Sequence, residues 1–344
     1  MSHISLAFIL HSAILQLPSR GKMSKKKTQS AAAAVEAAMQ SSSIERGHRL
    51  GNYHNYYFHH PPSNRIDVLE EQCLIHCIAR RLLEKCKFSE ISPRKKQRTN
   101  DQTTCDHAGN TQNLLKYCDL GCNEGDLTIA LANAVLERCH ELSSGNDDDK
   151  GSNKHKNINI ECLGLDIDPT LIERANTKYG SSNDPKKKDG HSDIDARFEI
   201  CNLCDDAQHV SKYKVFLGDV ERFDLTTLFS TTMWIHVHAG DDGLRDFLKR
   251  TCDKTDMLVV EPQISKCYGR ANTRLRKMDR PELDSVTSQE LSMRGNIEEE
   301  IEMSILACGF SRVTTVEEDK ERRAGTSDAN RTAWKRQIQL YVRE

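Results

Sequence analysis

The chain has 344 residues, of which 49 are Lys or Arg and 51 are Asp or Glu, for a formal net charge of −2. A nearly neutral chain excludes a global basic field as the means of attracting nucleic acid. Its 13 cysteines, without a convincing secretory leader, indicate a reducing compartment rather than a disulfide framework. We therefore expect a cytoplasmic or nuclear protein.

The first 46 residues are expected to form a disordered tail, because they are mostly polar or rich in alanine. The apolar run over 6–17 is interrupted by His11 and Ser12 and is too short to span a bilayer, so no membrane association is expected. Residues 1–22 have two open interpretations, a transit peptide or an upstream start ahead of Met23.

Residues 47–344 are predicted to form one α/β domain, because strand and helix patterns alternate there in a single series. Polar stretches near 93–112, 141–157 and 181–196 are predicted to be surface insertions in that domain. A solvated loop is the simplest interpretation of the short basic runs within them, although the run at 94–98 also fits a weak nuclear-import signal.

The first predicted strand ends at Asp119 and enters a turn with two glycines, Gly121 and Gly125, followed by a helix over 127–136. Glycines let the backbone approach a ligand closely, and the amides at the start of the helix point toward it. A dinucleotide site would have a third glycine and would avoid Asp119, whose carboxylate repels phosphate. The turn favours S-adenosylmethionine over NAD, although Gly and Asp are also ordinary turn residues.

The second predicted strand, over 163–168, ends in carboxylates. A ribose needs an acidic acceptor about 20 residues beyond the glycine turn. Asp166 follows Gly125 by 41 positions, and removing the 17 residues of the insertion at 141–157 leaves 24. We therefore predict that Asp166 binds the ribose. The alternative role, N-cap of a helix starting at Pro169, suits Asp168 better.

A third strand over 197–201 leads into Asn202 and Leu203, which are predicted to lie against an adenine. Asp219 competes for this role, but Asn202 is preferred because the stretch over 210–219 then supplies the crossover helix that a parallel sheet requires. Further strands are predicted over 223–229 and 257–260, then a helix over 297–308 and two terminal strands over 311–316 and 334–342.

This order of elements predicts a class I SAM-dependent methyltransferase fold, with a Rossmann-like, mostly parallel seven-stranded sheet and an antiparallel last strand. Ligands of open α/β sheets bind outside the carboxyl ends of the strands, so the polar residues at these ends should meet in one crevice, namely 119, 166, 202, 230–236 and 261. Cys201 and Cys204 have zinc-type spacing but no second pair follows, so core packing and no metal are expected.

Several short motifs occur together along the domain. They are G-N-Y at Gly51–Tyr53 with H-P-P-x-x-R at His60–Arg65, D-L-G-C-N at Asp119–Asn123, D-I-D-P at Asp166–Pro169, T-M-W-I-H at Thr232–His236 with G-D-x-G-L at Gly240–Leu244, and E-P-Q at Glu261–Gln263. With them, the chain resembles the RNA 5′-phosphate methyltransferases related to bicoid-interacting protein 3, over about residues 50–342.

The resemblance implies methylation of the 5′-phosphate end of a small RNA. One branch of that family caps the γ-phosphate of a nuclear RNA, and the other methylates 5′-monophosphate ends. Lys266-Cys-Tyr268, Arg274-Leu-Arg-Lys277 and Thr232-Met233 resemble the monophosphate branch. The alternatives are γ-phosphate capping, or methylation of a small molecule or protein. Small RNA is the implied partner, and no obligatory protein partner is expected.

The resemblance also implies a cofactor site. Arg65 is expected to contact the carboxylate of S-adenosylmethionine. The full expected cofactor-binding set is Arg65, Asp119, Gly121, Asn123, Gly125, Asp166, Asn202, Leu203 and Phe229. Ile264 and Ser265 stand where the family has Pro-Trp, which removes an aromatic wall near the acceptor.

The acceptor chemistry restricts the residue types that the site requires. A phosphate monoester has its second pKa near 6, so at neutral pH its terminal oxygen is already a nucleophile and needs no general base. We therefore expect no catalytic base but donors that position the phosphate, with His236, Lys266 and the run Arg274–Lys277 as candidates. Tyr53, Tyr56 and Trp234 are candidates to stack on the terminal base. A core role is an equal alternative for Trp234, and it is the favoured role for His238.

Overall fold

The computed structural model describes residues 51, 55–91, 113–144, 158–180, 193–288, 290–314 and 336–344. The chain divides into two units, Met1–Gly47 and His48–Glu344, and every described residue belongs to the second unit. The expected N-terminal tail and Tyr53 lie outside the described residues, as do most residues of the three expected insertions.

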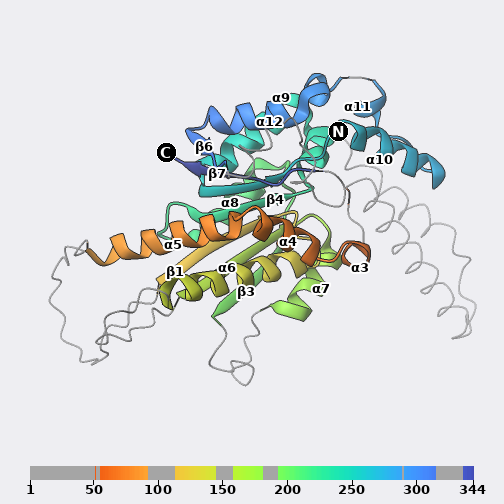
Figure 1. Ribbon diagram of the computed structural model, residues 1–344. Helices are drawn as coiled ribbons and strands as arrows, with labels where there is room; N and C mark the ends of the chain where they lie inside the picture. Colours follow the sequence, from red (N-terminus) through yellow and green to blue (C-terminus); the bar gives the residue numbers. More distant parts are fainter. Residues whose placement is uncertain are drawn as a thin grey trace, which may run out of the picture. The chain divides into compact units, whose positions relative to one another are not determined.

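A seven-stranded sheet forms the centre of the domain, in the order β3-β2-β1-β4-β5-β7-β6 (Figure 1). The neighbours among the first five strands pair in parallel, and β7 is antiparallel to both β5 and β6. This is the sheet of class I SAM-dependent methyltransferases, so the predicted fold class is confirmed. The strands are β1 (Asn113–Leu120), β2 (Ile158–Asp166), β3 (Ile194–Ile200), β4 (Phe223–Phe229), β5 (Thr255–Glu261), β6 (Phe310–Arg312) and β7 (Gln339–Arg343).

Both faces of this sheet are buried beneath helices. Successive side chains of a strand point to opposite faces, so each strand contributes to two apolar clusters. In β1, Tyr117 belongs to one apolar cluster and Cys118 to the other; in β5, Val259 and Leu258 divide in the same way. Helices on one face are α4 (Ser63–Glu71), α5 (Leu74–Ile91), α6 (Asp126–Ser144) and α7 (Pro169–Tyr179). Those on the other are α8 (Asp206–Leu217), α9 (Thr232–Asp253), α10 (Lys266–Lys277) and α12 (Ile297–Leu306), with α11 (Asp284–Thr287) and the 3₁₀ turn η1 (Ser292–Asn296).

Several element boundaries differ from the sequence-based predictions. Helix α6 extends to Ser144, and β3 begins at Ile194, so both enter ranges expected to be polar insertions. The crossover helix before β4 is present as α8, and Asp168 is the N-cap of α7 as expected, since its carboxylate accepts from the Thr170 and Leu171 amides. The short helix α3 (Tyr56–His59) and helices α4 and α5 precede the sheet and were not predicted.

Among the residues that the structure describes, no helix is both long enough and apolar enough to cross a bilayer.

Candidate functional site

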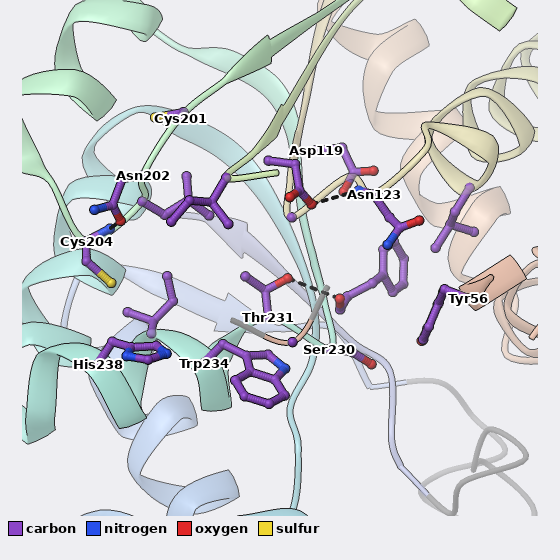
Figure 2. Close-up of a pocket in the computed structure, with 18 of the residues that line it drawn as sticks. Tyr56, Asp119, Asn123, Cys201, Asn202, Cys204, Ser230, Thr231, Trp234 and His238 are labelled. Atoms are coloured by element: carbon purple, nitrogen blue, oxygen red, sulfur yellow. Dashed lines mark hydrogen bonds between the residues drawn. The ribbon is translucent and has the colours of Figure 1, made fainter. Parts of the chain in front are cut away.

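A cavity of about 310 Å³ opens at the carboxyl ends of β1, β2 and β4 (Figure 2). Its walls include nine residues that the sequence had singled out, namely Arg65, Asp119, Gly121, Asn123, Asp166, Asn202, Leu203, Phe229 and Trp234. The parallel sheet brings these side chains together, because the strand ends that carry them lie at one edge. Gly51, Tyr57, Thr231, Ile235 and His238 also line the cavity.

The two glycines of the β1–α6 turn serve different purposes. Both have a positive φ, +84° at Gly121 and +80° at Gly125, which other residues rarely adopt. A Cβ on Gly121 would lie 2.2 Å from Oγ1 of Thr231, so this glycine lets the turn approach the cavity wall. Gly125 does not line the cavity; a Cβ there would lie 2.6 Å from the Phe198 ring. In this structure Gly125 packs the turn against the sheet, and its expected contact with the cofactor stays a prediction.

Asp166 is buried at the tip of β2 and is held by backbone amides. Its Oδ2 accepts from the Asn123 amide at 3.0 Å, and its Oδ1 accepts from the Asp168 amide at 3.0 Å. Burial raises the pKa of Asp166 to about 6, although these amides act to lower it. A carboxylate that is only 4% exposed yet lines a cavity is placed to accept hydrogen bonds from hydroxyl groups of a ligand.

Asp119 is also buried, and neighbouring side chains bind both of its oxygens. Thr128 donates to Oδ2 at 2.5 Å and Thr227 donates to Oδ1 at 2.7 Å. Burial raises the pKa of Asp119 above its ordinary value, and the two threonines and the Arg65 charge act in the opposite direction. The carboxylate thus faces the cavity as a fixed acceptor and, as expected, gives this wall an acidic character.

Arg65 lies fully buried beneath the cavity and joins segments that are far apart in the sequence. Its Nη2 donates to Glu261 Oε2 at 2.8 Å, to the Tyr56 hydroxyl at 2.7 Å and to Ser230 Oγ at 3.0 Å. Burial acts to raise the pKa of Glu261, but the positive charge of Arg65 lowers this pKa below its ordinary value. The sequence treated Arg65 as a direct ligand of the cofactor carboxylate, whereas here its guanidinium also binds three protein groups at the cavity wall.

Ser230 is the residue on which this network converges. It has a φ of +57°, unusual for a residue other than glycine. Its hydroxyl donates to Glu261 Oε2 at 2.6 Å and accepts from Arg336 Nη1 at 2.5 Å. Ser230 thus has a strained, left-handed backbone conformation in the cavity wall. Its contacts with two arginines and a glutamate maintain that conformation.

Asn202, Leu203, Cys201 and Cys204 form one end of the cavity. Oδ1 of Asn202 accepts from the Cys204 amide at 3.1 Å, which leaves the side-chain NH₂ available for a ligand. Figure 2 shows Asn202, Cys204 and His238 at this end, and Asn123 and Tyr56 at the other. The cavity is thus elongated between these two groups.

Trp234, on the first turn of α9, is partly buried against the core and also lines the cavity. Trp234 thus has both core contacts and a place in the cavity wall, and its expected stacking on the terminal base stays a prediction. Gly51 lies against its ring, since a Cβ there would fall within 2.1 Å of the indole. Gly51 is the first residue of the G-N-Y motif, so the sequence contained a signal for its place at the site. Its positive φ of +83° allows the close approach to Trp234.

His236 is not placed as a phosphate donor. It is fully buried, with Nδ1 2.7 Å from the Tyr268 hydroxyl and Nε2 2.6 Å from Asp241 Oδ1, and it does not line the cavity. Lys266 is exposed at the start of α10 and does not line the cavity either. His238, for which a core role was favoured, is instead exposed and lines the cavity wall.

The structure's described ranges contain no group of three or more His, Cys, Asp and Glu side chains arranged to hold a metal ion. Cys201 and Cys204 are free thiols at the cavity wall. Burial raises the pKa of both.

The sheet order and this cavity define the class of the protein, a class I SAM-dependent methyltransferase. Residues 223–343 match the family model described as bicoid-interacting protein 3. The pre-miRNA 5′-monophosphate methyltransferase of Xenopus laevis is 32% identical over 293 residues, which cover 85% of this chain and 91% of that protein. The RNA 5′-monophosphate methyltransferase of Homo sapiens is 29% identical over 254 residues, covering 73% and 70%. The chain belongs to the bicoid-interacting protein 3 family.

Among solved structures, a SAM-dependent methyltransferase from Methanosarcina mazei overlaps 66% of this chain and 90% of its own, with a TM-score of 0.36 and 13% identity.

Proposed function

We propose that this chain is a SAM-dependent O-methyltransferase that methylates the 5′-phosphate end of small RNA, and that the end it accepts is the monophosphate. The observation that carries the proposal is the cavity at the strand ends, whose wall combines the Asp166 carboxylate and the Asn202 amide with the aromatic side chains of Trp234 and Tyr56. Relatives that share up to 91% of their length with the chain carry names of this activity.

The residues present fit S-adenosylmethionine. Asp166 would accept from the ribose hydroxyls, and Asn202 with Leu203 would lie against the adenine. Gly121 leaves space that a Cβ would fill, beside Asn123, where the backbone turns toward the cavity. Asp119 would face the amino group of the methionine half. When bound, S-adenosylmethionine supplies a methyl group that an oxygen nucleophile can accept.

The chain's own residues position the acceptor rather than activate it. A phosphate dianion is already nucleophilic at neutral pH, since its second pKa is near 6. Holding the reacting groups in line can contribute roughly 7 to 11 kcal/mol through effective concentration. Both carboxylates of the cavity accept hydrogen bonds from neighbouring protein groups, so neither is placed as a free general base.

The partly exposed ring of Trp234 offers a flat surface for the terminal base, since bases of single-stranded RNA ends stack on aromatic side chains. Ile264, which stands where the family has proline, packs against the core and does not line the cavity. The acceptor region is therefore bounded by Trp234, Gly51 and Tyr56 rather than by a side chain from the segment after β5.

The test is transfer of a labelled methyl group to one RNA prepared with a 5′-monophosphate, a 5′-triphosphate or a 5′-hydroxyl end. We expect transfer to the monophosphate end, little to the triphosphate end and none to the hydroxyl end. Equal or faster transfer to the triphosphate would assign the chain to γ-phosphate capping. Transfer to none of the three ends would support the alternative of a small-molecule or protein substrate.

A further inference from the structure

Helix α10 has two sharply different faces. Its buried face packs into the core through Cys267, Tyr268, Ala271, Asn272 and Leu275. Four cations lie exposed at positions i, i+4, i+8 and i+11 on the other face, namely Lys266, Arg270, Arg274 and Lys277. This spacing places the four on one side of a helix, and they form what we call the basic stripe. At 1.5 Å per residue the stripe is ~16 Å long.

The helix that carries the basic stripe is firmly attached to the domain. The Tyr268 hydroxyl lies 2.7 Å from His236, and the Asn272 side chain accepts from the Leu283 amide at 2.8 Å. Arg336 Nη2 donates to Cys267 Sγ at 3.6 Å, and Nη1 of the same guanidinium reaches Ser230 in the cavity wall. The stripe is therefore held in a fixed position relative to the cavity.

The start of α10 lies close to the cavity, because Arg336 contacts both Cys267, next to Lys266, and Ser230 in the cavity wall. Tyr56, which lines the cavity, has its ring centroid 5.2 Å from that of His60. The pKa of His60 is lowered chiefly by burial and further by the charges of Arg65, His59, Arg336 and Arg274. Figure 1 shows α10 on the same side of the domain as α3, the helix that carries Tyr56.

Like charges at i and i+4 on a helix repel one another, so the stripe opposes the stability of its own helix. Lys266, Arg270 and Lys277 form no ion pair with any residue in the part of the chain that the structure describes. By contrast, Arg276 on the same helix pairs with Glu282 at 3.0 Å. A self-repelling row of cations beside a cavity is complementary to a polyanion.

We propose that the basic stripe of α10 binds the phosphate backbone of the RNA just beyond the 5′ end that enters the cavity. The proposal rests on the proposed function and deepens it, because it makes an RNA chain, rather than a single phosphorylated nucleotide, the preferred substrate. Phosphate contacts of this kind position a nucleic acid without reading its sequence. They supply an affinity that falls as salt concentration rises.

The experiment compares the wild-type protein with a triple variant, Arg270→Gln, Arg274→Gln and Lys277→Gln. Binding of a 5′-monophosphorylated RNA hairpin is measured directly, by fluorescence anisotropy at several salt concentrations. We expect the triple variant to bind at least tenfold more weakly near physiological salt. The slope of log K against log salt concentration should fall in magnitude by about 2 to 3, because about 0.7 to 0.9 is lost for each of the three phosphate contacts.

Two controls make the result specific. Arg276→Gln removes a cation of the same helix that Glu282 already neutralises, and it should leave hairpin binding within twofold of wild type. Methyl transfer to a 5′-phosphorylated dinucleotide, which is too short to reach along the stripe, should be unchanged in the triple variant. Unchanged far-UV circular dichroism and melting temperature would exclude misfolding as the cause.

The proposal is overturned if the triple variant binds the hairpin as tightly as wild type with the same salt slope, or if Arg276→Gln weakens binding equally. Failure of the proposed function has a different signature. In that case wild-type protein transfers no methyl group to either the hairpin or the dinucleotide, whereas the binding measurement still tests the stripe.

Discussion

Asp166 is subject to two opposing effects. Burial favours its protonated form, with a pKa of about 6, whereas a ribose hydroxyl donates a hydrogen bond most favourably to the ionised form. Without a ligand, the Asp166 carboxyl stabilises the fold most below pH ~4, the pKa of an aspartate in the unfolded chain. This contribution is lost as the pH rises through about 6, the pKa in the folded protein. The loss amounts to at most about 3 kcal/mol.

We therefore predict that the affinity for S-adenosylmethionine, measured by calorimetry without RNA, rises with pH through about 6 and then levels off. It should be roughly tenfold weaker at pH 5 than at pH 7. Asp166→Asn should weaken binding at pH 7 by about 1.5 to 3 kcal/mol and remove the pH dependence.

His238→Asn is the matched control for that prediction, since it changes another polar side chain of the same cavity wall and leaves the Asp166 carboxylate in place. It should retain the pH dependence of wild type. If Asp166→Asn binds with wild-type affinity, the ribose assignment is wrong.

His236 provides a second prediction at the residue scale. Because the ring of His236 is fully buried and both of its nitrogens lie within hydrogen-bond distance of Tyr268 or Asp241, His236→Gln should lower the free energy of unfolding by about 1 to 3 kcal/mol. Turnover at saturating substrate, below the melting temperature, should stay within about threefold of wild type. A tenfold loss of turnover with unchanged thermal stability would instead support the phosphate-donor role expected from the sequence.

At the scale of elements, α9 contains a backbone kink at Gly240, with φ +75° and ψ −176°. These angles are essentially restricted to glycine, and the kink precedes Asp241, which binds His236. We predict that Gly240→Ala destabilises the protein by about 1 to 3 kcal/mol in urea denaturation, even though a Cβ there would meet no atom within 4 Å.

Gly295 offers the control for backbone strain. A Cβ there also meets nothing within 4 Å, and this glycine does not have a positive φ. Gly295→Ala should therefore change stability by less than about 0.5 kcal/mol. Equal effects of the two substitutions would mean that the kink at Gly240 is not a strained position.

Helix α9 also explains why His236 and His238 lie elsewhere than the sequence predicted. The sequence interpretation treated 230–236 as a strand end, whereas a helix begins at Thr232. On a helix, Trp234 and His238 share a face because they are four residues apart, and His236 points away from it. The helical period therefore places His238 at the cavity and His236 in the core. The β1 turn and the tip of β2 were predicted correctly because glycines and strand-end carboxylates are local signals.

At the scale of the whole domain, the sequence was sufficient for the fold class and for most of the cavity wall. Removing the polar stretch at 141–157 restored the expected spacing to Asp166, which lies beside Asn123 as the fold requires. The network of Arg65 could not be predicted, because its partner Glu261 is 196 positions away and nothing local encodes the pairing. The same holds for Arg336, whose contact with Ser230 depends on the antiparallel placement of β7.

The most direct measurement of the central claim is the mass of the 5′-terminal nucleotide, after the protein has acted on a 5′-monophosphorylated RNA and the product has been digested to nucleotides. The account predicts a terminal nucleoside monophosphate whose phosphate carries added methyl, while its base and ribose are unmodified. Methyl found on a base or ribose, or a terminal phosphate without methyl in the presence of S-adenosylmethionine, would contradict it.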